Sequence, residues 1–354
     1  DRVKIYINGT QETSFGTDNT MTDADKGWNN QQAHSIGRSG AYDSQYFDGY
    51  LAEVVSIDGS QLAATSFGEF DEDSPTIWKP KDVSGLTFGT NGFYLDFEDS
   101  SNLGNDANGG TDLTEVNLAA TDQSSDSPTN NFANLSNLNG VHYAGLTFSE
   151  GNLKVTTTAS QYAPAQSTIG FNSGKWYAEF KATDVDNWTM VGIVGQNATA
   201  TNSDIGKFSD GYGYIGGSSA GDGNTHSKKN NNSTAAYGAT YADGDIISVA
   251  VDCDNQKIYF GINGTWQDSG NPESGSTGTG AAFSISATPS SGNYFFAVGN
   301  YSGSQTPDWE ANFGSPAFSI SSGNSDANGY GNFEYSVPSG YLALCTKNLG
   351  SDGG

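Results

Sequence analysis

The residues best suited to bond-breaking chemistry lie in the acidic run Glu69-Phe70-Asp71-Glu72-Asp73. In an extended strand, side chains two residues apart point to the same face, so Glu69, Asp71 and Asp73 would share one face. Two such carboxyl groups can act as general acid and as nucleophile on either side of a glycosidic bond. The run is therefore a candidate glycoside hydrolase site. A glycine before it and a Ser-Pro pair after it favour a solvent-facing loop as the alternative.

Histidine and cysteine suggest no second centre of this kind. The three histidines, His34, His142 and His226, are scattered, and none has the spacing of a metal ligand or of a catalytic triad. Cys253 and Cys345 belong to no Cys-x-x-Cys pair, which argues against structural zinc. One bridge in a chain of this length would be no disulfide framework, so the sequence favours two free thiols.

Short acidic turns are the remaining candidates for a metal site. Calcium takes oxygen ligands, which the clusters Asp184-Val185-Asp186-Asn187 and Asp252-Cys253-Asp254-Asn255 supply. Neither cluster fits an EF-hand, and Asp and Asn also favour plain hairpin turns. Apart from calcium, no cofactor is expected. The candidate calcium ligands are Asp184, Asp186, Asp252 and Asp254.

The segment 195–240 is the richest candidate for recognition of a partner. Aromatic faces can stack on sugar rings, and two adjacent lysines would make a positive spot on an acidic surface. The candidate contact residues there are Tyr212, Tyr214, His226, Lys228 and Lys229. Trp188 and Trp266 stand beside expected turns and are candidate exposed anchors. The alternative is that at least one of these tyrosines and one of these tryptophans belong to the core.

The overall charge excludes several classes of partner. The chain of 354 residues carries 14 basic and 40 acidic residues, a net charge of −26. Nucleic acid would be repelled, and docking onto anionic lipid is disfavoured. No apolar run approaches the ~20 residues that a membrane span needs, so no membrane insertion is expected.

Short alternating runs between turn residues predict a chain built of β-strands. No window of eleven or more residues has the apolar spacing of a helix. Strands at roughly 8–12-residue spacing indicate sandwiches or barrels. The clearest strands are expected at 3–7, 50–55, 93–97, 175–181, 190–194, 246–252, 257–262 and 294–298.

Two Asn-Gly dipeptides predict hairpin turns. Asn8-Gly9 and Asn263-Gly264 each follow a strand with a basic and an aromatic residue. A type I′ turn needs positive φ at both central residues, which Asn and Gly tolerate. We expect the two turns to occupy equivalent places in two similar sandwiches; a chance repeat is the alternative.

Residues 150–316 resemble the SPRY domain. The matching segments run in the family's order: 174–180, 191–194, 210–214, 237–238, 244–249, 258–264 and 311–314. The resemblance implies a bent two-sheet sandwich of the concanavalin A-like class, which binds a partner through loops at one end and does not catalyse.

Residues 4–9, 36–37 and 47–54 resemble the C-terminal half of a laminin-G-like or concanavalin A-like domain. That family's earlier strands are missing, and neither an initial Met nor a signal peptide is visible, so the chain is expected to begin inside a domain. Laminarinases of this class carry Glu-x-Asp-x-Glu on an inward strand, whereas the third residue here is Asp73. Residues 78–132 and 341–346 resemble proteins of marine tailed phages.

The predicted fold is all-β, with two concanavalin A-like jelly-roll sandwiches joined by an irregular linker. We expect the C-terminal part of a laminin-G-like sandwich at 1–98 and an Asn/Ser/Gly-rich connector at 99–140. A SPRY-like sandwich should follow at 141–320 and a C-terminal extension at 321–354.

The expected function is that of a non-enzymatic surface protein, on a virion or outside a cell. It would bind a host glycan or protein, or neighbouring virion subunits, through sandwich loops, and would be a homo-oligomer or part of a larger assembly. Two alternatives stay open. One is a glycoside hydrolase that uses the Glu69 run, and the other is a purely structural fibre subunit without ligand.

Overall fold

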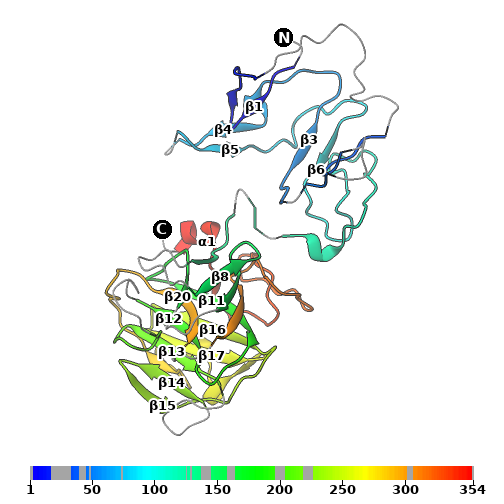
Figure 1. The fold of residues 1–354 in the computed structure, drawn as a ribbon. Helices are drawn as coiled ribbons and strands as arrows, with labels where there is room; N and C mark the ends of the chain where they lie inside the picture. The colour runs from blue at the N-terminus through cyan, green and yellow to red at the C-terminus, as the bar shows by residue number, and fades with distance from the viewer. Residues whose placement is uncertain are drawn as a thin grey trace. The chain divides into compact units, whose positions relative to one another are not determined.

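The computed structural model describes residues 3–16, 33–39, 45–47, 49–72, 75–124, 126–127, 130–136, 145–157, 164–195, 204–217, 226–300 and 306–352. The chain divides into unit 1, Asp1–Thr129, and unit 2, Asn130–Gly354. Figure 1 draws both as strand-built bodies. The all-β prediction is confirmed, because the one α-helix of the described residues is the seven-residue α1 (Thr346–Asp352).

Unit 1 forms three small antiparallel sheets in its described part. Each has two strands, and no larger sheet joins them within the described residues. The pairs are β1 (Tyr6–Ile7) with β2 (Thr10–Gln11), β3 (Val54–Ser56) with β6 (Phe93–Leu95), and β4 (Gly68–Phe70) with β5 (Trp78–Pro80). Unit 1 also has two 3-10 helices: η1 (Ala64–Ser66) lies between β3 and β4 in sequence, and η2 (Ala120–Asp122) follows β6. The laminin-G-like architecture of unit 1 stays a prediction.

The ring of Trp78 is the packing centre of one end of unit 1. A side chain at Gly9 or Gly68 would collide with the indole, so both glycines permit close approach of the backbone. Phe70 meets the same indole edge-on, with 5.0 Å between ring centroids. The turn at Asn8-Gly9 has φ values of 49° and 74°, which confirms its predicted positive-φ geometry.

Unit 2 contains a seven-stranded and a nine-stranded sheet (Figure 1). The first runs in the order β15 (Ser233–Ala236), β14 (Ser227–Asn230), β13 (Gly211–Ile215), β12 (Thr189–Val194), β20 (Phe295–Asn300), β10 (Ala165–Ser167), β7 (Leu135–Ser136). The second runs β18 (Thr265–Trp266), β17 (Lys257–Ile262), β16 (Ile246–Asp252), β11 (Lys175–Asp184), β21 (Asp308–Asn312), β9 (Lys154–Thr157), β8 (Leu146–Ser149). β19 (Phe283–Ser284) pairs with β17, and β22 (Leu342–Ala343) pairs with β11.

All of these pairings are antiparallel except β11 with β22, which is parallel. The short helices η4 (Gln267–Ser269) and η5 (Pro272–Thr277) follow β18 in sequence. The second Asn-Gly turn joins β17 to β18, with φ of 47° at Asn263 and 78° at Gly264, again as predicted. Within the described residues, this turn belongs to a nine-stranded sheet and the first to a two-stranded one, so the expected equivalence of their places finds no support there.

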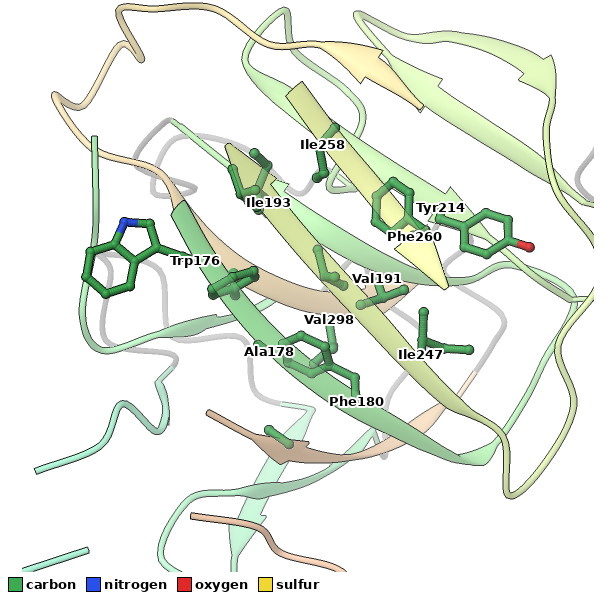
Figure 2. Packing of buried hydrophobic residues seen from close by; sticks show 14 of the residues in the cluster. Trp176, Ala178, Phe180, Val191, Ile193, Tyr214, Ile247, Ile258, Phe260 and Val298 are labelled. Atoms are coloured by element: carbon green, nitrogen blue, oxygen red, sulfur yellow. The ribbon is translucent and has the colours of Figure 1, made fainter. Parts of the chain in front are cut away.

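The main core of unit 2 lies between its two sheets. Figure 2 shows Trp176, Ala178 and Phe180 of β11 among side chains such as Val191 and Ile193 of β12. These residues are spaced by two along each strand, so they share the inward face, and all five are fully buried. The strict alternation of the sequence thus builds the interior of a β-sandwich.

A second apolar layer covers the opposite face of the nine-stranded sheet. Tyr177 of β11 and Tyr259 of β17 pack there with Phe333 and Tyr341 from the end of the chain. The rings of Tyr177 and Phe333 meet edge-on, with 5.1 Å between centroids. Both faces of β11 are therefore covered, which explains why successive residues from 176 to 180 are buried.

Two segments expected outside the sandwich are built into it. Residues 135–136 of the predicted connector form β7, which pairs with β10. The predicted extension supplies β22 and the second apolar layer, where Phe132 forms a β-bridge with Cys345. Cys345 and Cys253 are both buried and free, which confirms the prediction of two free thiols.

Candidate functional site

The segment 195–240 is not one long loop. Its described residues form β13, β14 and β15 at one edge of the seven-stranded sheet, while residues 196–203 and 218–225 lie outside the described residues. Tyr212 and Tyr214 alternate with glycines along β13, so both rings point into the sandwich.

Tyr212 and Tyr214 are core residues, and their predicted contact with a partner is wrong. Tyr212 is 4% exposed, and its hydroxyl accepts the Ser286 N–H at 3.0 Å. Tyr214 is fully buried, and its ring lies 5.4 Å from that of Phe260. Its hydroxyl donates to the Ala239 carbonyl. The alternative of core tyrosines is thus the correct one.

Lys228 and Lys229 do not form the predicted positive spot. Lys229 is 1% exposed, and its Nζ pairs with Asp204 Oδ2 at 2.9 Å, which neutralises its charge inside the unit. Burial lowers the pKa of Lys229, and the Asp204 charge opposes that shift. Lys228 is half-buried and donates to the Ala282 carbonyl at 2.6 Å, with its Nζ 5.2 Å from the ring centre of Phe283.

Two further candidates are half-buried at turns or strand ends. His226 places Nδ1 3.1 Å from the Tyr237 carbonyl oxygen. Trp188 lies in the turn between β11 and β12. For His226, Lys228 and Trp188, contact with a partner stays a prediction.

The candidate calcium ligands around residue 252 close turns and an ion pair. Asp252 accepts two hydrogen bonds from Asn255, at 2.9 and 2.8 Å, and pairs with Lys175 at 3.2 Å. Asp254 accepts the Gly174 N–H at 2.9 Å. Both Asp252 oxygens and Asp254 Oδ1 thus accept hydrogen bonds from the chain, in keeping with the alternative of hairpin turns.

The other two candidates belong to an acidic surface turn. Asp186 accepts the Thr306 N–H at 2.6 Å. Asp184 is exposed, and partial burial, together with the charges of Asp186, Asp243 and Asp308, raises its pKa. The described residues contain no group of three or more His, Cys, Asp or Glu side chains arranged to hold a metal ion.

The described part of the acidic run, residues 69–72, begins in β4 of an exposed hairpin. Glu69 of β4 sits opposite Lys79 of β5, with 3.8 Å between their charged atoms, and lies 3.7 Å from Lys81. Asp71 lies 3.4 Å from Lys79, and Asp73 falls outside the described residues. The two carboxylates therefore share lysine counter-charges on a two-stranded sheet, in keeping with the solvent-facing alternative.

A pocket of about 330 Å³ forms where two distant segments of unit 2 meet. One segment runs from β18 into η5, and the other is residues 336–338, which follow Phe333 of the second apolar layer. The pocket is lined by Trp266, Gly270, Asn271, Pro272, Glu273, Ser336, Val337 and Pro338. Its volume is near the lower end for small-ligand sites, and it combines an indole and prolines with one carboxylate.

Local sequence signals fix the first side of the pocket. Asn271 caps η5, because its side chain accepts the Glu273 N–H at 3.0 Å, and Pro272 supplies the preset φ of a first helical residue. Glu273 Oε1 then accepts the Ser339 N–H at 2.7 Å. Half-buried Trp266 rests edge-on against Tyr177, with 6.5 Å between centroids.

A buried carboxylate holds the second side against the sheet. Glu179 of β11 accepts hydrogen bonds from the N–H groups of Glu334 and Tyr335, at 2.9 and 2.8 Å. The Tyr177 hydroxyl, at 2.9 Å, and the Asn312 amide, at 3.3 Å, complete the set. Burial raises the pKa of Glu179. This contact fixes the backbone directly before the pocket residues 336–338.

Of the pocket residues, the sequence had pointed only to Trp266. The motif Asn-Pro-Glu at 271–273 is a helix-start signature, and it could have located Glu273 at a turn beside that tryptophan. Val337 and Pro338 carry no comparable signal, because a contact over more than sixty residues leaves no local pattern.

Comparison with known proteins finds one family that is similar to part of the sandwich. A family model described as the SPRY domain matches residues 175–306. The solved SPRY domain of human HERC1 is similar at 16% sequence identity and a TM-score of 0.36, over 50% of this chain and 96% of that one. The stonustoxin structure gives the same identity and TM-score, over 51% of this chain and 27% of that chain.

A search of the curated proteins gives no match. Within the described residues, no helix has the length and apolarity that crossing a membrane requires. SPRY domains are protein–protein interaction modules, which is compatible with non-enzymatic binding. Residues 175–306 thus match the SPRY domain model, in agreement with the resemblance seen in the sequence.

Proposed function

We propose that this chain is a non-enzymatic binding protein whose unit 2 recognises a protein partner. The observation that carries the proposal is the SPRY match over residues 175–306, in a sandwich with a filled interior. The segment after this match adds the second apolar layer and one side of the pocket, so the partner-binding surface includes residues beyond the family's own core.

The surroundings we propose are the surface of a virion, or more generally the outside of a cell. The resemblance of residues 78–132 and 341–346 to marine tailed-phage proteins supports this setting. Exposed apolar side chains in unit 1, such as Tyr50 at 77% and Val116 at 64%, support assembly with neighbouring subunits.

The experiment is a parallel screen of the full-length protein on three classes of ligand. Panning against a random-peptide display library should enrich peptides that bind with saturable affinity. A glycan array tests the sugar-binding version, and laminarin, agar and carrageenan test for release of reducing sugar.

Enriched peptides that compete with one another support a protein-binding domain. Glycan binding without peptide binding would overturn it in favour of a lectin. Release of reducing sugar that Glu69→Gln and Asp71→Asn both abolish would overturn the non-enzymatic assignment altogether. If nothing binds and the protein still assembles, the chain is a structural subunit and the proposal fails.

A further inference from the structure

The residues that line the pocket at Trp266 limit the chemical class of ligand that it can bind. Glu273 is the one charged residue of its lining. The carboxylate is exposed and oriented by the Ser339 N–H, and it forms no ion pair with any described residue. A carboxylate held in place beside an aromatic ring and lacking a counter-charge is suited to a cation.

The ring and the apolar lining define what kind of cation fits. The face of a tryptophan attracts cations and stacks on planar groups. Val337 and the buried Pro272 and Pro338 add apolar surface for an aliphatic stem. A guanidinium is planar, stacks on aromatic rings and pairs with carboxylates through two parallel hydrogen bonds, whereas an ammonium is a compact, strongly hydrated point charge.

We infer that this pocket binds the arginine side chain of a partner polypeptide, with the guanidinium between Trp266 and Glu273 and the stem against Val337 and Pro338. The inference rests on the proposed function, because it names the chemistry by which unit 2 would recognise its protein partner. The net charge of −26 favours the approach of a basic segment.

The same features disfavour a neutral sugar as occupant. Sugar recognition needs several polar groups directed at hydroxyls, and the Asn271 side-chain oxygen already accepts the Glu273 N–H, which leaves few such groups in this lining. An acidic glycan would in addition be repelled by the carboxylate. We therefore expect no saturable binding of a sugar in this pocket, which the test below checks.

The test uses the full-length, isotope-labelled protein and a pair of small probes. N-acetyl-arginine amide carries the guanidinium, and N-acetyl-citrulline amide has nearly the same shape without charge. The indole N–H signal of Trp266, assigned through Trp266→Phe, reports on the pocket. We expect saturable shifts with the arginine probe and at least tenfold weaker binding of the citrulline probe.

Two matched variants separate the pocket from the general negative charge. Glu273→Gln should weaken binding of the arginine probe at least tenfold. Glu150→Gln removes an exposed carboxylate in the turn between β8 and β9, and should change the affinity less than twofold. Both leave the apolar core intact, so loss of folding does not complicate the comparison.

Three results would each overturn the inference: equal affinity for the two probes, an affinity of Glu273→Gln for the arginine probe equal to that of wild type, or no shift of the Trp266 indole signal. So would saturable shifts of the same indole with glucose or N-acetylglucosamine in place of arginine. Display peptides that bind wild type and Glu273→Gln equally would overturn the arginine pocket yet leave the protein-binding function standing. If the arginine probe shifts the indole signal but no peptide is enriched, the arginine pocket stands and the protein-binding function is overturned.

Discussion

Unit 2 buries its large apolar side chains in layers on both faces of a nine-stranded sheet, whereas unit 1 leaves many of its own exposed. Every exposed large apolar side chain of the described residues belongs to unit 1, from Val3 at 59% to Leu118 at 49%. The strands of unit 1 are two or three residues long, and β11 of unit 2 has ten. The described sheets of unit 1 have only two strands each, and the large apolar side chains buried among its described residues are Val83, Phe88, Leu95 and Leu103.

The polar side chains differ in the same way. In unit 2, Glu179 and the Lys229–Asp204 pair are fully buried and satisfied by partners of the chain. In unit 1, Glu69 and Lys79 are about half exposed in their ion pairs. Unit 2 therefore supplies a rigid scaffold for a binding pocket, while the surface of unit 1 is suited to being covered by neighbours.

The largest expected effect compares two phenylalanines. Phe180 is fully buried between the rings of Phe296 and Phe313, so Phe180→Ala should lower the free energy of unfolding by about 3–5 kcal/mol. Phe70 is 44% exposed and packs in a T-shaped arrangement with Trp78, so Phe70→Ala should cost about 1 kcal/mol or less. Urea unfolding followed by circular dichroism measures both. Equal costs would contradict the contrast between the units.

The next effect compares two lysines. Removing Lys229 leaves Asp204 buried without its counter-charge, so Lys229→Ala should cost about 3 kcal/mol and lower the melting temperature clearly. This replaces the sequence-based expectation that Lys229 contributes to a positive spot on the surface. Lys79→Ala, at an exposed ion pair, should cost less than about 1 kcal/mol.

Differential scanning calorimetry of the two lysine variants makes this comparison directly. The double variant Lys229→Met/Asp204→Asn is the control, because it removes both charges while the Asn oxygen can still accept the Gly206 N–H, and it should recover part of the loss. A melting temperature of Lys229→Ala equal to that of wild type would show that the pair is not buried.

Local patterns predicted much of unit 2 and failed where burial depends on distant segments. The alternation of residues 175–181 predicted β11, and both Asn-Gly turns were placed correctly. The pattern at Tyr212 and Tyr214 predicted a strand equally well but not which face is inside. Glu179 shows the limit, because its partners at 334 and 335 are far away in sequence and no period connects them.

Unit 1 was predicted less well for a related reason. A hairpin signal such as Asn8-Gly9 fixes a turn but not the number of strands that join the sheet. Residues resembling the final strands of a sandwich therefore suggested a larger sheet than the described residues form. For the pocket, Trp266 was found because aromatic residues beside turns are common anchors. Glu273 was missed because its place in the pocket depends on Ser339, which donates a hydrogen bond to it, and on Val337, which lines the same pocket.

The third prediction concerns pH and the buried carboxylate. Burial raises the pKa of folded Glu179 above its ordinary value of 4.5, so the folded state holds the proton more tightly than the unfolded state. The resulting stability is complete below pH 4.5 and is lost as the pH rises through the raised pKa. Glu179→Gln removes this dependence, because an amide does not titrate in this range.

Urea unfolding of wild type and Glu179→Gln over a series of pH values tests the sign. The advantage of wild type should shrink as the pH rises. The control is Glu69→Gln in unit 1, which alters exposed ion pairs with Lys79 and Lys81 and should leave that slope unchanged. An advantage that grows with pH would mean that the hydrogen bonds of the Glu179 carboxylate outweigh its burial.

The smallest expected effect comes from the turn chemistry that both units share. Gly264 has φ of 78°, a region in which a branched side chain is strained, and an added Cβ would lie 2.7 Å from a ring carbon of Tyr335. Gly264→Val should therefore cost about 1–2 kcal/mol in urea unfolding. Gly9 has nearly the same φ, 74°, and its added Cβ would collide with Trp78.

Gly244→Val separates the two contributions. Gly244 has φ of 90° but nothing within 4 Å of an added Cβ, so this variant reports the backbone strain alone, about 1 kcal/mol. The excess cost of Gly264→Val over Gly244→Val measures how firmly Tyr335 is held beside the Glu179 contact. If the two variants cost the same, the Tyr335 side chain moves aside freely. The segment 334–338, which completes the pocket, is then held less firmly than its hydrogen bonds to Glu179 indicate.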